Sequence, residues 1–164
     1  MQPLEILTYP DERLKTVCEP VEEFTPELRE FAEHLQYTAS QGPSAVGIAA
    51  PQVGRMQRIC LVDATRAKRP VDNHGPLILV NPEITKWAGF AVGREGCLSI
   101  PDYTGKVIRA EVINVIGQDL NGKAVQYKMT GFEARIAQHE IDHLDGILFL
   151  DRLVSRRADL KVRK

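Results

Sequence analysis

The sequence predicts an α+β protein in which mostly antiparallel β-sheets pack around a central α-helix at about residues 130–145, with an N-terminal helix at about 25–40. Three observations support this class. Short apolar runs bounded by Pro, Gly or polar residues indicate buried strands, Asn121-Gly122 between two such runs indicates a hairpin, and a capped stretch of helical periodicity follows. No repeat or linker divides the chain, so we expect one domain over 1–164.

The first predicted helix covers residues 25–39. Thr25 is a suitable N-cap, and Pro26 suits the first helical position. Apolar side chains recur at intervals of three and four residues, at Leu28, Phe31, Ala32 and Leu35. Gly42-Pro43 ends the helix. The next segment, 44–54, contains two glycines and a proline among small apolar residues, so we expect a tight, buried loop or a bent strand.

The middle of the chain is predicted to be β-structure. Ile59–Val62 and Leu77–Val80 are short apolar runs, which are typical of buried strands. Val107–Ile116 is rich in β-branched residues, and apolar and polar residues alternate over 125–129. Asn121-Gly122 lies between these two runs, which predicts a β-hairpin.

The second predicted helix has the clearest boundaries. Thr130 and Glu133 have the spacing of a capping box, and Gly146 lies where a left-handed residue is favoured after a helix. His139 and His143 are four residues apart, so both imidazoles can reach one metal ion, and the intervening Glu140 completes an H-E-x-x-H motif.

The face of this helix that carries the H-E-x-x-H motif is predicted to point inward. Phe132 and Ile136 share it with the two histidines and Glu140, whereas the opposite face carries Arg135, Gln138, Asp142 and Asp145. Burying two imidazoles and a carboxylate without partners would be unfavourable by several kcal/mol, and a bound metal ion removes that penalty. The motif therefore predicts a metal site.

A third ligand must lie upstream, because no His or Glu follows His143. Cys97 is the best candidate, since it lies in Gly93–Pro101, a glycine-rich segment that allows close backbone approach. The other candidates have simpler interpretations. We expect buried structural thiols or solvated imidazoles at Cys18, Cys60, His34 and His74.

Composition excludes several classes of protein. The net charge is −1, from 21 Lys and Arg against 22 Asp and Glu, so a dedicated nucleic-acid binder is disfavoured. No apolar run is long enough to span a bilayer, and the N-terminus has no secretory signal pattern. Three widely spaced cysteines do not form a disulfide framework, so we expect a reducing, cytoplasmic location. The basic C-terminal segment, 152–164, is expected to be a solvated tail.

Three segments, in order, resemble the signature motifs of the peptide deformylase family: Gly47–Gln52 (GIAAPQ), Glu95–Ser99 (EGCLS) and Gln138–His143 (QHEIDH). The first residues of the chain are also similar to the start of that family, so the resemblance covers nearly the whole sequence. One position departs from the family pattern, because the first motif usually begins with a glycine where this chain has Ala45.

The resemblance implies a metal-dependent hydrolase that removes the N-formyl group from the N-terminal formyl-methionine of new polypeptides and releases formate. It implies that Cys97, His139 and His143 hold one divalent ion, Fe²⁺ natively, with Zn²⁺ or Ni²⁺ able to substitute. A metal-bound water would be the nucleophile, since the ion lowers its pKa from about 16 to roughly 7. Glu140 would act as general base and then as general acid.

The same resemblance assigns oxyanion stabilisation to the Gln52 side-chain amide and the Leu98 backbone N–H. Gly47 would let the backbone pair with an extended peptide. The residues expected to bind substrate are Val46, Gly47, Ile48, Gly96, Phe132 and Ile136, with core packing as the alternative for Ile48, Phe132 and Ile136. An ion pair between Glu95 and Arg109 is expected to stiffen the segment around Cys97.

Formyl-methionyl peptides are therefore the expected partners, with the ribosome as a further expected partner and neither DNA nor a membrane. Two other functions remain open at the level of sequence. A metal-dependent peptidase also uses an H-E-x-x-H motif, although the cysteine ligand disfavours it. A non-catalytic peptide-binding homologue is suggested only by Ala45.

Overall fold

The computed structural model describes residues 1–163. Eight strands are present in the described chain: β1 (Gly47–Ala49), β2 (Ile59–Val62), β3 (Leu77–Ala88), β4 (Ala91–Cys97), β5 (Ile100–Arg109), β6 (Val112–Gln118), β7 (Ala124–Thr130) and β8 (Leu160–Val162). The helices are α1 (Pro26–Ser40), α2 (Gly131–Leu144) and α3 (Arg156–Asp159), with short 3-10 helices η1 (Glu12–Lys15), η2 (Ala50–Val53), η3 (Ala64–Arg66) and η4 (Phe149–Arg152).

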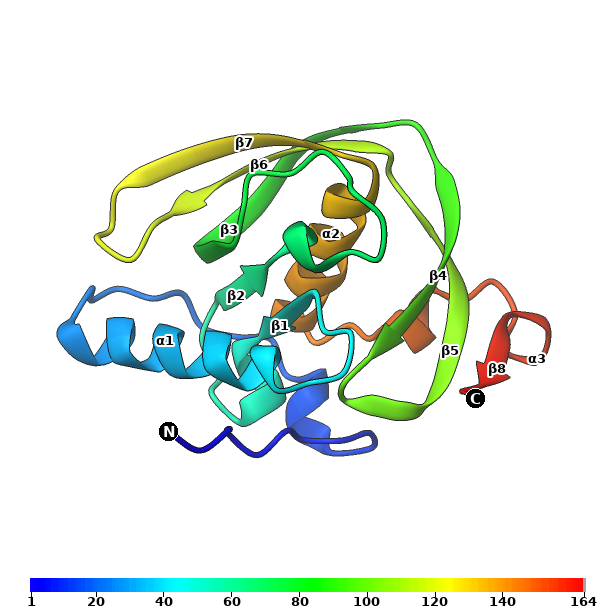
Figure 1. Ribbon diagram of the computed structural model, residues 1–164, viewed down its shortest axis with the longest axis horizontal. Coiled ribbons are helices and arrows are strands. Elements are labelled where there is room, and N and C mark those ends of the chain that lie inside the picture. The colour runs from blue at the N-terminus through cyan, green and yellow to red at the C-terminus, as the bar shows by residue number, and fades with distance from the viewer. Residues whose placement is uncertain (164) are drawn as a thin grey trace.

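The strands form two antiparallel sheets around α2, as Figure 1 shows. The larger sheet has the order β1–β2–β3–β6–β7, and the smaller sheet has the order β4–β5–β8. This arrangement confirms the predicted α+β fold with antiparallel sheets around a central helix. No helix within residues 1–163 is long and apolar enough to cross a membrane.

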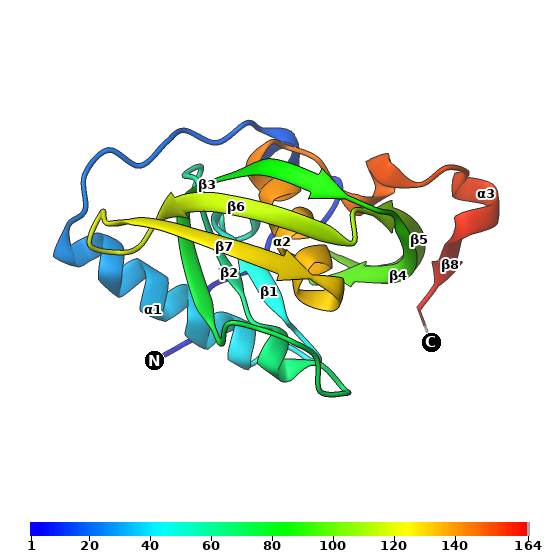
Figure 2. The ribbon, with the colours of Figure 1, turned by 90° about the horizontal axis from the view of Figure 1, so that it is seen from above.

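Helix α1 begins as predicted, because Thr25 Oγ1 accepts a hydrogen bond from the Leu28 backbone N–H at 3.2 Å. The helix lies along β1 and β2 (Figure 2). Leu28 and Leu35 are buried in a core cluster that includes side chains of these strands. The predicted bent segment 44–54 contains β1 and η2.

Strand β2 is buried on both faces, as its apolar run predicts. Ile59 and Leu61 belong to the core cluster shared with α1, whereas Cys60 and Val62 belong to the cluster shared with α2. This alternation follows from the two-residue period of a strand. The β1–β2 pair therefore lies between the two long helices, with α1 on one face and α2 on the other.

The β-branched run Val107–Ile116 is divided between two strands. Arg109 ends β5 and Val112 begins β6, so the run crosses from the small sheet to the large one. At the crossing, the Ala110 N–H donates to Gln138 Oε1, and Gln138 Nε2 donates to the Ala110 carbonyl, both at 2.9 Å. The side chain of Gln138 thus replaces a strand partner. The predicted hairpin is present as β6–β7.

The ends of α2 agree only in part with the sequence. Thr130 is the N-cap residue and Gly146 has a φ of 74°, as predicted. The capping box is absent, because the Thr130 side chain makes no capping hydrogen bond. The Glu133 carboxylate instead accepts hydrogen bonds from the His74 backbone N–H at 2.7 Å and from its Nδ1 at 2.6 Å.

The C-terminal segment is folded rather than a solvated tail. Strand β8 pairs with β5, in the register Gly105↔Leu160 and Tyr103↔Val162. Phe149 and Leu150 in η4 are buried in the core of the small sheet, which anchors the segment. Its basic side chains are exposed in the described part, so the expectation of solvation is correct for those side chains and wrong for the backbone.

Candidate metal centre and active site

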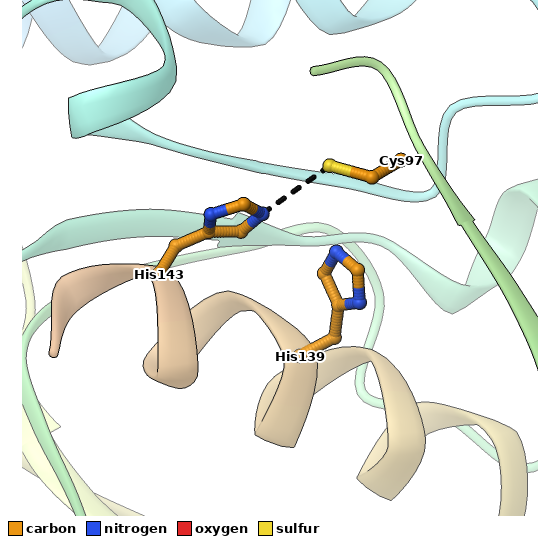
Figure 3. Close-up of side chains that lie close together, drawn as sticks. All are labelled: Cys97, His139 and His143. Atoms are coloured by element: carbon orange, nitrogen blue, oxygen red, sulfur yellow. Dashed lines mark hydrogen bonds between the residues drawn. The ribbon is translucent and has the colours of Figure 1, made fainter. Parts of the chain in front are cut away.

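A buried cluster of three potential ligands lies between α2 and the small sheet. The Cys97 Sγ and one ring nitrogen from each of His139 and His143 all lie within 4.8 Å of one another. Figure 3 shows Cys97 at the end of its strand and the two imidazoles on successive turns of α2. The His143 Nε2 lies 3.3 Å from the Cys97 Sγ. The three residues that the sequence singled out as ligands are thus brought together.

Cys97 is held by a hairpin, although the sequence suggested a glycine-rich loop. It is the last residue of β4, pairs with Ile100 of β5, and is separated from it by the turn Leu98-Ser99. The register shifts between Glu95 and Cys97, so the strand pairing is irregular beside the cysteine.

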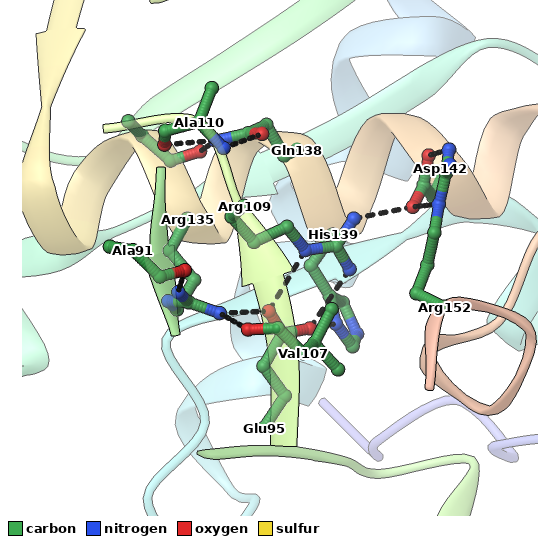
Figure 4. Close-up of polar contacts among 11 residues, drawn as sticks. Ala91, Glu95, Val107, Arg109, Ala110, Arg135, Gln138, His139, Asp142 and Arg152 are labelled. Carbon is green, nitrogen blue, oxygen red and sulfur yellow. Dashed lines mark hydrogen bonds and ion pairs between the residues drawn. The ribbon is translucent and has the colours of Figure 1, made fainter. Parts of the chain in front are cut away.

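His139 is oriented by Glu95, which in turn is held by two arginines (Figure 4). The His139 Nδ1 lies 2.8 Å from Glu95 Oε1, so a proton on Nδ1 leaves Nε2 free for a metal ion. Arg109 donates two hydrogen bonds of 2.9 Å to Glu95, which confirms the expected ion pair. Arg135 Nη1 donates to the same carboxylate at 2.7 Å.

Glu95 remains ionised despite its burial. Burial alone would raise its pKa, but hydrogen bonds from Arg109 and His139 outweigh that effect and hold the pKa well below its usual value. A negative charge beside Nδ1 makes the imidazole of His139 a stronger ligand. The sequence predicted the contact between Glu95 and Arg109, but it gave no signal for Arg135, which was expected on the opposite face of α2.

Glu140 lies against β1 and is 4 % exposed. A Cβ built on Gly47 would lie 2.7 Å from Glu140 Oε2 and 2.9 Å from the Leu61 carbonyl oxygen, so a larger residue does not fit there. Burial raises the pKa of Glu140 to about 7, a value suited to a group that both accepts and donates a proton near neutral pH.

Gln52 contacts the cluster directly. Its Oε1 accepts a hydrogen bond from the Ala49 N–H at 2.9 Å, which fixes the orientation of the amide. Its Nε2 donates to the Cys97 Sγ at 3.4 Å and to the Ser99 Oγ at 3.1 Å. Ser99, which is fully buried, belongs to the EGCLS segment, but the sequence assigned it no role of its own.

The residues expected to bind substrate occupy different environments. Ile136 lies beside Gly47, with its Cγ2 at 3.0 Å from the position of an added Cβ. Ile48 is fully buried in the cluster facing α1, which corresponds to core packing, the alternative given above. Phe132 is 36 % exposed and borders a surface cavity of about 480 Å³ together with Pro70 and Val71. Val46 and Leu98 are half-buried, and Gly96 is exposed.

The other candidate ligands are placed elsewhere. Cys18 and Cys60 are buried thiols, as expected, and burial raises the pKa of Cys18 to about 11. His34 binds the Gln2 carbonyl oxygen. His74 was expected to be simply solvated, but it is anchored to Glu133, because that buried carboxylate needs donors.

The donor set fits a divalent transition metal. One thiolate and two imidazoles are three protein ligands, which leaves a coordination position for water or substrate. Among buried side-chain atoms of the described chain, Glu140 Oε1 and His143 Nδ1 lack a hydrogen-bond partner. Glu140 directly follows His139 in α2, and its unpartnered, buried carboxylate oxygen is available to bind a water molecule or substrate.

Comparisons with known proteins identify the family of this chain. The model of the family described as Polypeptide deformylase matches residues 3–159. A peptide deformylase of Hydrogenovibrio crunogenus is 42% identical over 164 residues, which cover 100% of this chain and 94% of the relative.

Solved structures show the same fold. The crystal structure of peptide deformylase from Thermotoga maritima aligns with a TM-score of 0.84 and 34% identity, covering 94% of this chain and 100% of that chain. A Met-Ala-Ser-bound class I type b peptide deformylase from Acinetobacter baumannii aligns with a TM-score of 0.85 and 36% identity, covering 93% and 99%. With its buried Cys/His/His cluster and a match over nearly its whole length, this chain belongs to the polypeptide deformylase family.

Proposed function

We propose that this protein removes the N-formyl group from the formyl-methionine of new polypeptides and releases formate. The observation that carries the proposal is the convergence of Cys97, His139 and His143 beside the buried Glu140. These three residues would hold one divalent ion. When bound, such an ion acts as a Lewis acid, which brings the pKa of a coordinated water to about 7 and polarises a carbonyl.

Glu140 is the proposed proton carrier. Its unpartnered Oε1 would accept the proton of the attacking water and then deliver it to the departing amine of methionine. Gly47 leaves room for the carboxylate on one side, which keeps it close to β1. The same group therefore serves as base and then as acid.

Gln52 and Leu98 are the proposed stabilisers of the oxyanion. The Gln52 amide is fixed through the Ala49 N–H, so its Nε2 already points at the cluster before substrate binds. Removing such a donor in other enzymes has raised the activation barrier by about 3 kcal/mol. The Leu98 backbone N–H belongs to the turn that follows Cys97 and would supply the second donor.

Strand β1 is the proposed peptide-binding edge. It lies at the end of the large sheet and pairs only with β2 among the described strands, so an extended peptide can add to its other side. Gly47 and Ile136 then lie near the first side chain of the substrate. The structure of the Acinetobacter baumannii relative with Met-Ala-Ser supports a peptide beginning with methionine as the ligand.

Ferrous iron is the metal that we propose, with Zn²⁺ or Ni²⁺ as substitutes, because a thiolate with two imidazoles suits all of these ions. The Fe²⁺ form is expected to lose activity in air as iron or the Cys97 thiolate oxidises, whereas the Ni²⁺ form is expected to be stable. Parallel half-life measurements with and without oxygen test this. Equal half-lives for the Fe²⁺ form in both conditions would contradict it.

We further propose that the chain works as a single catalytic domain in the cytoplasm. The three cysteines are buried and unpaired, which supports a reducing compartment. The exposed basic side chains within 152–163 would favour approach to the ribosome. Salt-insensitive ribosome association, or association unchanged when these side chains are neutralised, would refute that last point.

The proposed activity is tested by measuring formate release from a short formyl-methionyl peptide by metal-loaded protein. Glu140→Ala is expected to abolish release while the protein still binds metal. Internal cleavage of the same peptide, without formate release, would identify a peptidase instead. Activity that survives in Glu140→Ala would refute the proton-transfer role.

A further inference from the structure

We infer that Arg152, in the short helix η4, is a positioning residue for the metal ligand His139. This inference rests on the proposed metal site and extends it to the C-terminal segment. The two residues are joined by a continuous chain of charged side chains, Arg152–Asp142–Arg109–Glu95–His139 (Figure 4).

At the outer end of this series of charged side chains, Arg152 makes a two-point contact with Asp142. Arg152 Nη2 donates to Asp142 Oδ1 at 2.9 Å, and Arg152 Nε donates to Oδ2 at 3.0 Å. A bidentate contact of this kind fixes the plane of the carboxylate as well as its position. The Arg152 side chain is 46% exposed, whereas that of Asp142 is 11% exposed.

The inner links are almost fully buried. Asp142 Oδ2 also accepts a hydrogen bond of 2.6 Å from Arg109 Nη1. Arg109 uses its other two nitrogens to hold both oxygens of Glu95, and Glu95 Oε1 faces His139 Nδ1. Because Arg152 fixes the plane of Asp142, it directs Oδ2 at Arg109. Without Arg152, Asp142 can rotate and Arg109 loses a fixed anchor.

A second contact connects η4 to the same ligand. The Phe149 ring is 1 % exposed and stacks on the His139 ring, with centroids 6.4 Å apart and planes 24° apart. The first residue of η4 thus restrains one face of the imidazole, while its last residue acts through the charged chain. Both restraints depend on η4 remaining in place against α2.

Lys15 provides a matched control. It binds Asp151, the neighbour of Arg152 in η4, at 2.9 Å, and its side chain is 45% exposed, nearly the same as that of Arg152. Lys15→Gln therefore removes an equally exposed ion pair from the same short helix without touching the charged chain to His139. An effect confined to Arg152 would separate ligand positioning from simple attachment of η4.

The experiment loads the full-length protein with Co²⁺ and follows its release to a chelator, together with the absorption spectrum of the bound ion. Arg152→Gln is expected to release Co²⁺ about tenfold faster than the unmodified protein and to shift the spectrum. Arg152→Lys should restore only part of the retention, because it keeps a positive charge at Asp142 but cannot make the two-point contact. Lys15→Gln should match the unmodified protein.

Two results would overturn the inference: an unchanged release rate and spectrum in Arg152→Gln, or equal acceleration in Arg152→Gln and Lys15→Gln. Thermal unfolding of the metal-free variants shows whether each one is folded. Should Arg152→Gln fail to fold, Arg152→Lys takes its place in the test: release faster than from the unmodified protein supports the two-point contact, and an unchanged release rate refutes it. Failure of the unmodified protein to retain Co²⁺ would instead refute the proposed metal site.

Discussion

At the scale of single residues, Gly47 shows how backbone space controls the site. Gly47 was expected from the resemblance to contact the substrate through its backbone. The structure adds that an added Cβ would meet Glu140 Oε2 and the Leu61 carbonyl oxygen, and the latter belongs to the backbone of β2 and cannot move without disturbing the sheet. A methyl group at this position therefore displaces the proposed proton carrier.

Gly47→Ala is expected to lower kcat about a hundredfold, because a shift of about 1 Å in a reacting group has an effect of that size. Co²⁺ retention should be unchanged, since Gly47 touches none of the three ligands. Steady-state kinetics that are equal for Gly47→Ala and the unmodified protein would contradict the steric argument.

The three proposed metal ligands were predictable residue by residue, whereas most of their supporting contacts were not. His139, His143 and Cys97 follow from helical spacing, the lack of a downstream ligand and a three-motif resemblance. Arg135 and Asp142 were assigned to the opposite face of α2, yet they are tied to Glu95 and Arg109 there. Helical periodicity distinguishes the two faces of a helix, but it does not reveal that a second sheet covers the polar face.

At the scale of elements, α2 was predicted within one or two residues, but the reason for its stability was not. The spacing of Thr130 and Glu133 suggested a local capping box. In the folded protein a tertiary contact replaces that local one, because Glu133 is 1 % exposed and binds the loop residue His74. A local pattern does not show which partner a carboxylate will find when a distant loop packs beside it.

This difference gives a direct test by mutation. Thr130→Ala is expected to change the free energy of unfolding by less than about 0.5 kcal/mol, since the side chain makes no capping bond. Glu133→Ala is expected to lower it by about 1–3 kcal/mol, since the His74 backbone N–H and Nδ1 lose their buried, charged acceptor. Urea unfolding of the metal-free proteins measures both values. A larger loss of unfolding free energy for Thr130→Ala than for Glu133→Ala would contradict this and support a capping box.

The split of Val107–Ile116 between two sheets has a similar origin. β-branched composition indicates extended backbone, but it does not indicate where a strand leaves one sheet and enters another. That point is set by Gln138, whose side chain binds both backbone groups of Ala110. A glutamine on a helix gives no such indication in the sequence.

At the scale of the whole molecule, the buried charges make folding sensitive to acid. The pKa of Glu95 in the folded protein is below its ordinary value of 4.5. Its contribution to stability is therefore complete above pH 4.5 and is lost as the pH falls towards the folded-state pKa. Glu95→Gln should flatten the decline of stability below pH 4.5 in the metal-free protein, as measured by urea unfolding. A parallel decline in both proteins would contradict this.

The proposed metal ion would join the two sheets, because Cys97 ends a strand of the small sheet and both histidines belong to α2, which packs on the large one. Loading with Zn²⁺ at about a thousandfold above its dissociation constant is expected to add about 4 kcal/mol to the free energy of unfolding. Thermal unfolding with and without chelator measures this, and Cys97→Ser should show little dependence on the chelator.

The edge position of β1 bears on which polypeptides the enzyme can accept as substrates. A strand edge forms hydrogen bonds with backbone amide and carbonyl groups, which recur at the same spacing in every polypeptide whatever its sequence. In the proposed binding mode, selectivity is left to the formyl group and the first side chain, because the rest of the peptide would be held through backbone groups that every polypeptide has. Such an edge would let one enzyme act on many different polypeptides.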